Sequence, residues 1–129
     1  MTEEGLLGKH KHVLNLMNNA GVNAWEGWFP LIDRVLGIID RYNKHKKTNV
    51  KVLQIKEKFG MLRIYTDNPR YEYIEGMLDG IETISSTICE RCGSPGERRT
   101  DIGWHKTLCL DHYSARKLEL AVEKENETL

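Results

Sequence analysis

The sequence lacks an excess of either charge and lacks any long apolar run. Nineteen basic residues balance nineteen acidic ones in a chain of 129 residues. Proteins that bind long nucleic acid without sequence preference usually carry a net basic surface, so this class is disfavoured, although a local basic patch is compatible with the balance. No apolar stretch approaches the roughly 18 residues that a membrane-spanning helix needs. The first twelve residues also lack the apolar segment of a signal peptide, so we expect a cytoplasmic protein without membrane contact.

Cysteine is absent outside one short stretch, residues 89–112, where all three cysteines lie. Their spacing is Cys-x2-Cys, sixteen residues, and then Cys-x2-His. Thiolates and a neutral imidazole are preferred ligands of tetrahedral Zn²⁺, and three cysteines with one histidine are a common structural set. A redox Cys-x-x-Cys pair would leave the last two positions without a role, and three ordinary buried thiols are a further alternative. We therefore predict a structural zinc site, with the ligands Cys89, Cys92, Cys109 and His112.

The residues between these ligands predict a treble-clef-like zinc finger. Gly93 can adopt the positive φ that a knuckle requires, and Ser94-Pro95-Gly96 is a turn signal. Residues 97–107 leave room for a short hairpin, and the residues after Cys109 are good helix formers. A unit this small cannot bury enough apolar surface to fold alone. Metal binding would supply the missing stability, about 10–16 kcal/mol in comparable zinc peptides.

The rest of the chain predicts an α+β fold. Apolar residues at helical spacing predict three helices, and alternating residues around Gly60 predict a β-hairpin. We expect the helices to pack on one face of this antiparallel hairpin, with the zinc finger packed on the resulting core and a polar tail that frays. The predicted boundaries are helices at about 9–19, 28–43 and 70–86, a hairpin at 50–66, a core of 1–86, a zinc finger of 87–123 and a tail of 124–129.

The hairpin and the zinc finger carry the candidate binding residues. One face of the hairpin is apolar, with Leu53, Ile55, Phe59, Leu62 and Ile64. The opposite face is either solvated or a cationic surface for a phosphate-bearing ligand. Guanidinium groups on the zinc hairpin match phosphate geometry, and a nearby tryptophan either stacks a base or covers the core of the finger. The candidate ligand-binding residues are Lys56, Lys58, Arg63, Tyr65, Arg98, Arg99 and Trp104.

Two further groups near the N-terminus have alternative interpretations. Trp25, Trp28 and Phe29 form either part of the core or an aromatic platform for a flat ligand. His10 and His12 lie two residues apart and would point to different sides of a helix, so we expect surface residues. A second metal site there lacks evident carboxylate or imidazole partners nearby in the sequence.

Several motifs carry a resemblance to a known family. In order these are GWFPLI, QIKEKFGMLRIY, CERCGSPGERR and GW followed by TLCLDH. Over residues 27–113 the chain resembles a family of small, largely uncharacterised proteins carried by phages, prophages and bacteria. The resemblance places the zinc ligands at the same four positions and brings no catalytic residues. It implies a prokaryotic cytoplasm, which is the host's if a phage encodes the protein, and an accessory role such as countering host defence.

Three functions follow as expectations. Four protein ligands close a zinc site to water, which favours a non-enzymatic protein that binds a phosphate-bearing ligand such as a nucleotide or a nucleic acid. The first alternative is an adaptor or an inhibitor of a host protein, or a homodimer, with an exposed patch of Trp25, Phe29 and Tyr65. The second is a metal-dependent nuclease on a treble clef, with His105 as general base, for which the following helix offers no second His or Asn at a matching position.

Overall fold

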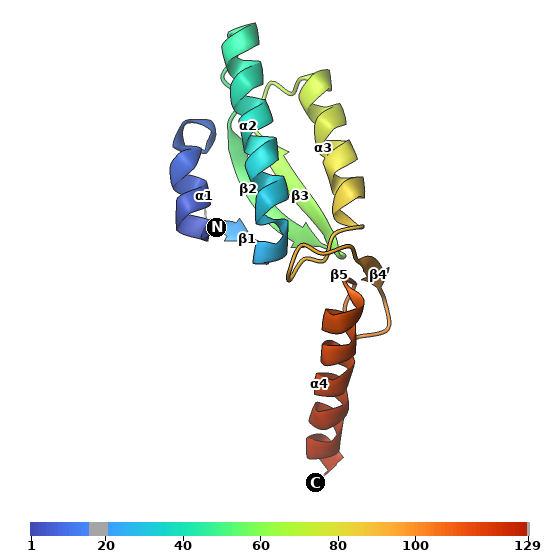
Figure 1. Ribbon diagram of the computed structural model, residues 1–129. Helices are drawn as coiled ribbons and strands as arrows, with labels where there is room; N and C mark the ends of the chain where they lie inside the picture. The colour runs from blue at the N-terminus through green and yellow to red at the C-terminus, as the bar shows by residue number, and fades with distance from the viewer. Residues whose placement is uncertain (16–20, 129) are drawn as a thin grey trace.

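Helices α2 (Phe29–Lys46) and α3 (Glu72–Ser85) pack on a small sheet, in a computed structural model that describes residues 1–15 and 21–128 (Figure 1). The hairpin strands β2 (Val52–Lys58) and β3 (Met61–Thr66) pair antiparallel, and β1 (Val22–Asn23) joins β2 in parallel. The predicted α+β class with a helix-covered hairpin is confirmed. Strand β1 is too short to give an alternating pattern, so the sequence did not indicate it.

Helix α2 supplies the centre of the core because its apolar residues recur at helical spacing. Ile32, Val35, Leu36 and Ile39 are fully buried against the sheet and the neighbouring helices. The helix ends where Lys47 adopts a left-handed conformation, with φ of 56°, and its amide donates to the carbonyl of Asn43. The predicted helix 28–43 is therefore present and continues for three more residues. Among the described residues, no helix has both the length and the apolar character needed to cross a bilayer.

The hairpin departs from simple alternation at one point. The β2–β3 register shifts between Val52 and Gln54, and Val52 and Ile55 are buried although they lie three residues apart. This bulge leaves Leu53 only half-buried, so its predicted place on the core face is wrong. The same prediction is wrong for Phe59, which lies in the turn with φ of 54° and is 41% exposed.

The first helix lies earlier than predicted. Helix α1 spans Glu3–Lys9, and a 3₁₀ turn follows at Lys11–Val13. The N-cap residue Thr2 starts the helix, because its side-chain oxygen accepts a hydrogen bond from the amide of Gly5 at 3.0 Å. The prediction of 9–19 was wrong over residues 10–15, because it rested on apolar spacing and ignored the cap. Its remaining part, residues 16–20, lies outside the described residues.

Two histidines hold this N-terminal segment against α2. The Nε2 atoms of His10 and His12 lie 2.7 and 2.6 Å from the Oδ1 atoms of Asp33 and Asp40. His10 is buried, so its predicted surface position is wrong, whereas His12 is exposed. The hydrogen bond from His10 lowers the pKa of Asp33 below its ordinary value of 3.8, although partial burial opposes the shift. The carboxylate partners of the two histidines lie on α2, more than twenty positions away in the sequence, so the residues near the histidines could not indicate them.

We expect Asp33→Asn to destabilise the protein by about 1.5 kcal/mol, the lower end for a hydrogen bond with a charged group. Because the pKa of Asp33 is depressed in the folded chain, its contribution is present above the unfolded pKa and is lost as the pH falls through the folded pKa. Urea unfolding between neutral pH and about pH 3 measures both effects. Asp40→Asn is the matched control, because its histidine partner is 55% exposed and should contribute less. Equal losses in the two variants would contradict this role of Asp33.

The C-terminal part consists of a small hairpin and a long helix. Strands β4 (Glu97–Arg99) and β5 (Lys106–Leu108) pair antiparallel, and α4 (Leu110–Thr128) follows. Residues 124–128, which we predicted as a polar tail, continue α4. Figure 1 shows α4 pointing away from the α+β body, with the chain end at its far tip.

Hydrogen bonds to main-chain carbonyls join the C-terminal part to the α+β body at two places. The amide of Gly27 donates to the carbonyl of Glu90 at 2.9 Å, and the indole of Trp28 donates to the carbonyl of Ile88 at 2.9 Å. At the hairpin turn, the Thr107 hydroxyl donates to the carbonyl of Gly60 at 2.6 Å. All these acceptors are main-chain atoms, so the contact depends on the backbone positions of both parts.

Candidate metal centre

The predicted Cys3His cluster is present at the start of the C-terminal part. Cys89 and Cys92 belong to a knuckle after α3, Cys109 ends the β4–β5 hairpin, and His112 lies in the first turn of α4. Their ligand atoms all lie within 4.8 Å of one another. Gly93 has φ of 82° and its amide donates to the carbonyl of Cys89 at 2.8 Å, which closes the knuckle. Four ligands separated by up to 23 residues therefore meet at one point.

The distances within the cluster suit a tetrahedral ion. The Sγ atoms of Cys92 and Cys109 are 3.8 Å apart, and Nδ1 of His112 lies 3.6 and 3.3 Å from the Sγ atoms of Cys89 and Cys109. Tetrahedral zinc with its usual bond lengths would separate two sulfurs by about 3.8 Å and a sulfur from a nitrogen by about 3.5 Å. The donor set and its spacing thus fit a closed, four-coordinate metal site.

The pKa values of two thiols, Cys92 and Cys109, indicate how a bound cation would act on the cluster. Hydrogen bonds from the side chain and the backbone of Ser94 lower the pKa of Cys92 to about 6. At Cys109 the amide of His112 donates a hydrogen bond that lowers the pKa. Desolvation and the neighbouring thiols of Cys89 and Cys92 outweigh it, so this pKa is raised. A cation would allow the thiols to ionise together, because its charge offsets their mutual repulsion.

A small apolar cluster surrounds the centre. Its buried members are Cys89, Ile102 and Leu108, and Tyr113 and Leu120 of α4 pack against them. Arg99 covers this cluster, because its guanidinium lies 4.3 Å from the Tyr113 ring and its Nε donates to the carbonyl of Leu108 at 3.3 Å. Arg99, a predicted phosphate ligand, is thus occupied by contacts within the protein.

A cavity of about 290 Å³ lies next to the metal centre, between the knuckle, β5, α4 and the segment before α2. We call it the junction pocket. Trp25 and Trp104 line it and are 49% and 54% exposed. Three cationic side chains from separate segments also line it, namely Arg91, Lys106 and Arg116. His112 reaches the pocket as well, so the metal centre forms part of its wall.

The wall of the junction pocket contains a buried carboxylate. Glu90 is fully buried, and its Oε2 accepts a hydrogen bond from the amide of Thr107 at 3.3 Å. Lys106 Nζ lies 3.3 Å from Oε1, an ion-pair distance without the geometry of a hydrogen bond. Desolvation raises the pKa of Glu90, and the charge of Lys106 opposes this effect. This contact with the buried carboxylate holds the partly exposed Lys106 at the pocket wall.

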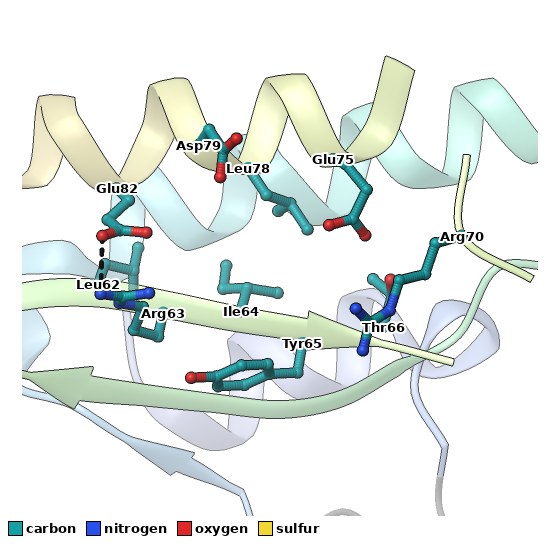
Figure 2. A pocket seen from close by; sticks show the side chains of 10 residues that line it. All are labelled: Leu62, Arg63, Ile64, Tyr65, Thr66, Arg70, Glu75, Leu78, Asp79 and Glu82. Atoms are coloured by element: carbon teal, nitrogen blue, oxygen red, sulfur yellow. Dashed lines mark ion pairs between the residues drawn. The ribbon is translucent and has the colours of Figure 1, made fainter. Parts of the chain in front are cut away.

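A second, smaller hollow of about 160 Å³ lies between β3 and α3 (Figure 2). Arg63 and Tyr65, two predicted ligand-binding residues, line it together with Arg70. Arg63 Nη2 pairs with Oε1 of Glu82 at 3.0 Å, and Glu75 and Asp79 of α3 lie along the same hollow (Figure 2). The cations here face carboxylates of α3, so this hollow is not a cationic surface.

The other predicted binding residues lie apart from the junction pocket, except Trp104. Arg98 Nε donates to the carbonyl of Phe59 at 3.0 Å, and Trp104 stacks on the Phe59 ring with centroids 5.8 Å apart. Lys58 also lies over Phe59, whereas Lys56 lies over the ring of Tyr65. The seven predicted residues therefore do not form one site.

Sequence reasoning missed most of the pocket. Trp25, Glu90, Arg91, Lys106 and Arg116 come from four segments, and no local pattern links them. The one available signal was local. Glu90 and Arg91 lie between the predicted metal ligands Cys89 and Cys92, so a bound metal would fix their backbone.

The aromatic residues ahead of α2 have separate roles. Trp28 and Phe29 are buried in the core, whereas Trp25 lies on the surface with the Arg91 guanidinium 4.0 Å from its ring centre. The exposed patch of Trp25, Phe29 and Tyr65 predicted for a protein partner does not form, because Phe29 is only 8% exposed.

The proposed nuclease base, His105, lies beside Phe59 and Arg98. Its ring meets the Phe59 ring edge-on at 5.9 Å, and its Nδ1 lies 3.4 Å from Arg98 Nη2. Within residues 1–15 and 21–128, the Cys3His cluster is the one group of three or more His, Cys, Asp or Glu side chains placed to hold a metal. His105 therefore has no second cation site beside it among the described residues.

Comparisons with protein families, with curated proteins and with solved structures found no match to the chain. The resemblance to the phage and bacterial family stays a prediction.

Proposed function

We propose that the protein is a non-enzymatic, zinc-stabilised binding protein whose junction pocket takes a phosphate-bearing ligand with a flat ring, such as a nucleotide. The observation that carries this proposal is the meeting of two half-exposed tryptophans and three cations around one cavity beside the metal centre. Indole rings stack on bases irrespective of sequence, and guanidinium and ammonium groups attract phosphate. These two kinds of group together match the two halves of a nucleotide.

The metal supports binding in this proposal by holding the pocket wall. Three thiolates and an imidazole at tetrahedral distances favour Zn²⁺ over cations that prefer oxygen ligands. Because four protein atoms complete the tetrahedron, the ion has no open position for water and acts as a structural cofactor. It fixes the knuckle that carries Glu90 and Arg91 and the start of the helix that carries Arg116.

Two of the three cations of the pocket, Arg116 and Arg91, can turn to a phosphate at little cost. Arg116 pairs with Glu119 at 2.9 Å and with Glu123 at 3.5 Å, and all three side chains are more than a third exposed. Exposed ion pairs of this kind contribute at most about 1 kcal/mol. Arg91 is stacked on Trp25 and keeps its hydrogen-bonding edge for an anion. The cavity volume lies just below the usual range for ligand pockets, about 300–1,000 Å³, which favours a mononucleotide or one terminal nucleotide over a long strand.

We expect Trp104→Ala to weaken nucleotide binding about tenfold, because stacking on one aromatic ring contributes roughly 1–3 kcal/mol per base. Titration calorimetry with purine and pyrimidine monophosphates measures this change, with inorganic phosphate as a probe for the cations alone. Tyr73→Ala is the matched control, because Tyr73 is 60% exposed and lies on α3, away from the junction pocket.

A second pair of variants separates the junction pocket from the zinc hairpin. Arg116→Gln should weaken binding of both nucleotides and phosphate, whereas Arg98→Gln should not, because Arg98 does not line the pocket. Zinc content and melting temperature should stay unchanged in both variants. Absence of binding of every nucleotide and of phosphate by the unaltered protein would contradict the proposal.

The biological role and the cellular location of the protein remain proposals. The resemblance described above supports an accessory role in a phage or a bacterium, including one directed against host defence, and a prokaryotic cytoplasm as its location. An adaptor or an inhibitor of a host protein is the alternative function, and it would need a surface other than the patch that the burial of Phe29 removes.

A further inference from the structure

A groove runs along the exposed face of α2. It consists of two open hollows, of about 550 and 560 Å³, which share Ile38 and Arg41 in their lining and are therefore continuous. Helix α2 lies between α1 and α3 (Figure 1), and both neighbours contribute to the lining, with Lys9 from α1 and Tyr73 from α3. We call this surface the α2 groove. It is separate from the junction pocket, because the two share no lining residue.

Cations dominate the lining of the α2 groove. They are Lys9, Arg34, Arg41 and Lys46. Asp33 is the one acid among the described lining residues, and Nζ of Lys9 lies 3.1 Å from its Oδ1, so these two charges offset each other. Within residues 1–15 and 21–128, the other three cations have no ion-pair partner. The groove therefore carries three uncompensated positive charges.

The stability of α2 does not explain its two arginines. A cation stabilises a helix near its C-terminus, where Lys46 lies, whereas Arg34 lies in the second turn. Arg34 and Arg41 are seven positions apart, about 10 Å along the helix axis, and nearly in line on one side. The acids that precede them, Asp33 and Asp40, lie about 100° around the helix and contact the N-terminal segment instead. The helix thus presents two unpaired guanidinium groups to the groove.

We propose that the α2 groove binds the phosphate backbone of a nucleic acid, as a second site that is independent of the junction pocket. Guanidinium and ammonium groups along a groove attract successive phosphates, and such contacts carry no base sequence. Arg34 and Lys46 are twelve positions apart, about 18 Å along the helix axis. This length corresponds to about five phosphates of one strand in a B-form duplex.

The residues of the groove favour a nucleic acid over an acidic protein or an anionic membrane. Protein interfaces have an apolar core, whereas interfaces with DNA are more polar and more positively charged. A helix that lies on a membrane needs exposed apolar side chains that enter the bilayer. Among the exposed large apolar side chains of the described residues, Tyr73 alone lines the groove, and its ring is stacked on Tyr42 with centroids 5.3 Å apart.

The number of unpaired cations sets the expected affinity and its salt dependence. Three phosphate contacts predict that the logarithm of the binding constant falls with the logarithm of the salt concentration with a slope of about −2 to −3. We expect dissociation constants of about 10–100 µM at physiological salt, within the range of sequence-independent binding. Binding of this strength agrees with a chain whose basic and acidic residues balance.

Fluorescence anisotropy over a range of salt concentrations tests the proposal, with a short labelled oligothymidylate and a short labelled duplex as probes. Arg34→Gln and Arg41→Gln should each weaken binding of at least one probe at low salt and reduce the magnitude of the salt slope by about 1. The double variant should weaken binding at least about tenfold at low salt. Both side chains are exposed and unpaired, so melting temperature and zinc content should stay unchanged.

Two further variants show where the probes bind. Arg70→Gln removes an exposed arginine that lines the hollow between β3 and α3, and it should bind the probes like the unaltered protein. Arg116→Gln should weaken binding of mononucleotides in the junction pocket and leave the salt slope of the probes unchanged. A loss of probe binding in Arg116→Gln but not in Arg41→Gln would assign the strand to the junction pocket and overturn the proposal.

Three other results would also overturn it. They are an equal loss of binding in Arg70→Gln and Arg41→Gln, no binding of either probe at low salt, and tighter binding to vesicles of phosphatidylglycerol than to both probes. The last result would identify the groove as a membrane contact. None of these outcomes depends on whether mononucleotides bind the junction pocket, so the two proposals can fail separately.

Discussion

Removing the metal is expected to unfold residues 88–112 while helices α2 and α3 remain folded. The apolar cluster around the centre has only three fully buried members, Cys89, Ile102 and Leu108, so packing alone cannot hold the knuckle and hairpin together. In comparable zinc peptides the metal contributes about 10–16 kcal/mol to folding, and we expect the loss here to approach the lower figure. Treatment with a strong zinc chelator, followed by hydrogen exchange, measures which amides lose protection.

The α+β body, which contains α2 and α3, provides the internal reference for amide protection in this experiment. Trp28, Ile32, Leu36 and Ile39 belong to a separate and larger core, so the amides of α2 should stay protected after chelation. The junction pocket and the first turn of α4 should lose their order together, because the knuckle and the helix both contribute ligand atoms to the Cys3His cluster.

A substitution and a re-addition test whether the effect is specific. Cys92→Ser should reproduce the chelated state, because it replaces a thiolate with a poor zinc ligand. Zinc should restore protection in the unaltered protein, whereas magnesium should not, because magnesium prefers oxygen ligands. A protein that keeps full protection and binds no stoichiometric metal would contradict both the site and the zinc assignment.

The metal cluster could be predicted because its spacing is local and its chemistry is restrictive. Cys89 and Cys92 lie within one turn of chain, as do Cys109 and His112, and few other functions need this combination of residues. The hairpin and helices α2 and α3 could also be predicted, because apolar residues that recur every 2 or 3.6 positions are recognisable within a short stretch of sequence. These features specify the fold class without any long-range information.

The remaining features depend on contacts between distant residues. The bulge after Val52 changes which side chains face the core, and alternation alone does not reveal it. His10 is buried because Asp33 of α2 accepts its hydrogen bond, and the two residues lie 23 positions apart. The junction pocket likewise exists only where the segment with Trp25 meets the segment with Arg116. Long-range packing of segments thus explains the burial of His10 and the residues of the junction pocket that were missed, whereas the first helix was misplaced for a local reason, the N-cap at Thr2.

We expect Gly27→Ala to be among the most destabilising single substitutions in the protein. Gly27 lies in a 3₁₀ turn directly before α2, where its amide donates to the carbonyl of Glu90. A Cβ atom there would lie 2.3 Å from the carbonyl oxygen of Cys89 and 2.5 Å from the carbonyl carbon and oxygen of Glu90. These are backbone atoms of the knuckle, so no side-chain rotation can relieve the overlap.

The knuckle and the body must therefore separate in the Gly27→Ala variant. The hydrogen bond from Trp28 to Ile88 lies at the same contact and should be lost with it. We expect the free energy of unfolding to fall by about 3 kcal/mol or more, as for severe overpacking. Urea unfolding in the presence of zinc measures the loss. Zinc affinity should fall as well, because metal binding and folding are linked.

Gly37→Ala is the matched control for this prediction. Gly37 lies within α2, and a Cβ atom there would have no atom within 4 Å apart from its chain neighbours and the backbone of its own helix. Alanine is the better helix former, so this variant should gain about 0.5–1 kcal/mol. The same chemical change ten positions along the chain should thus change the stability in the opposite direction. Equal stability of the two variants would show that the Gly27 contact does not hold the zinc finger to the body.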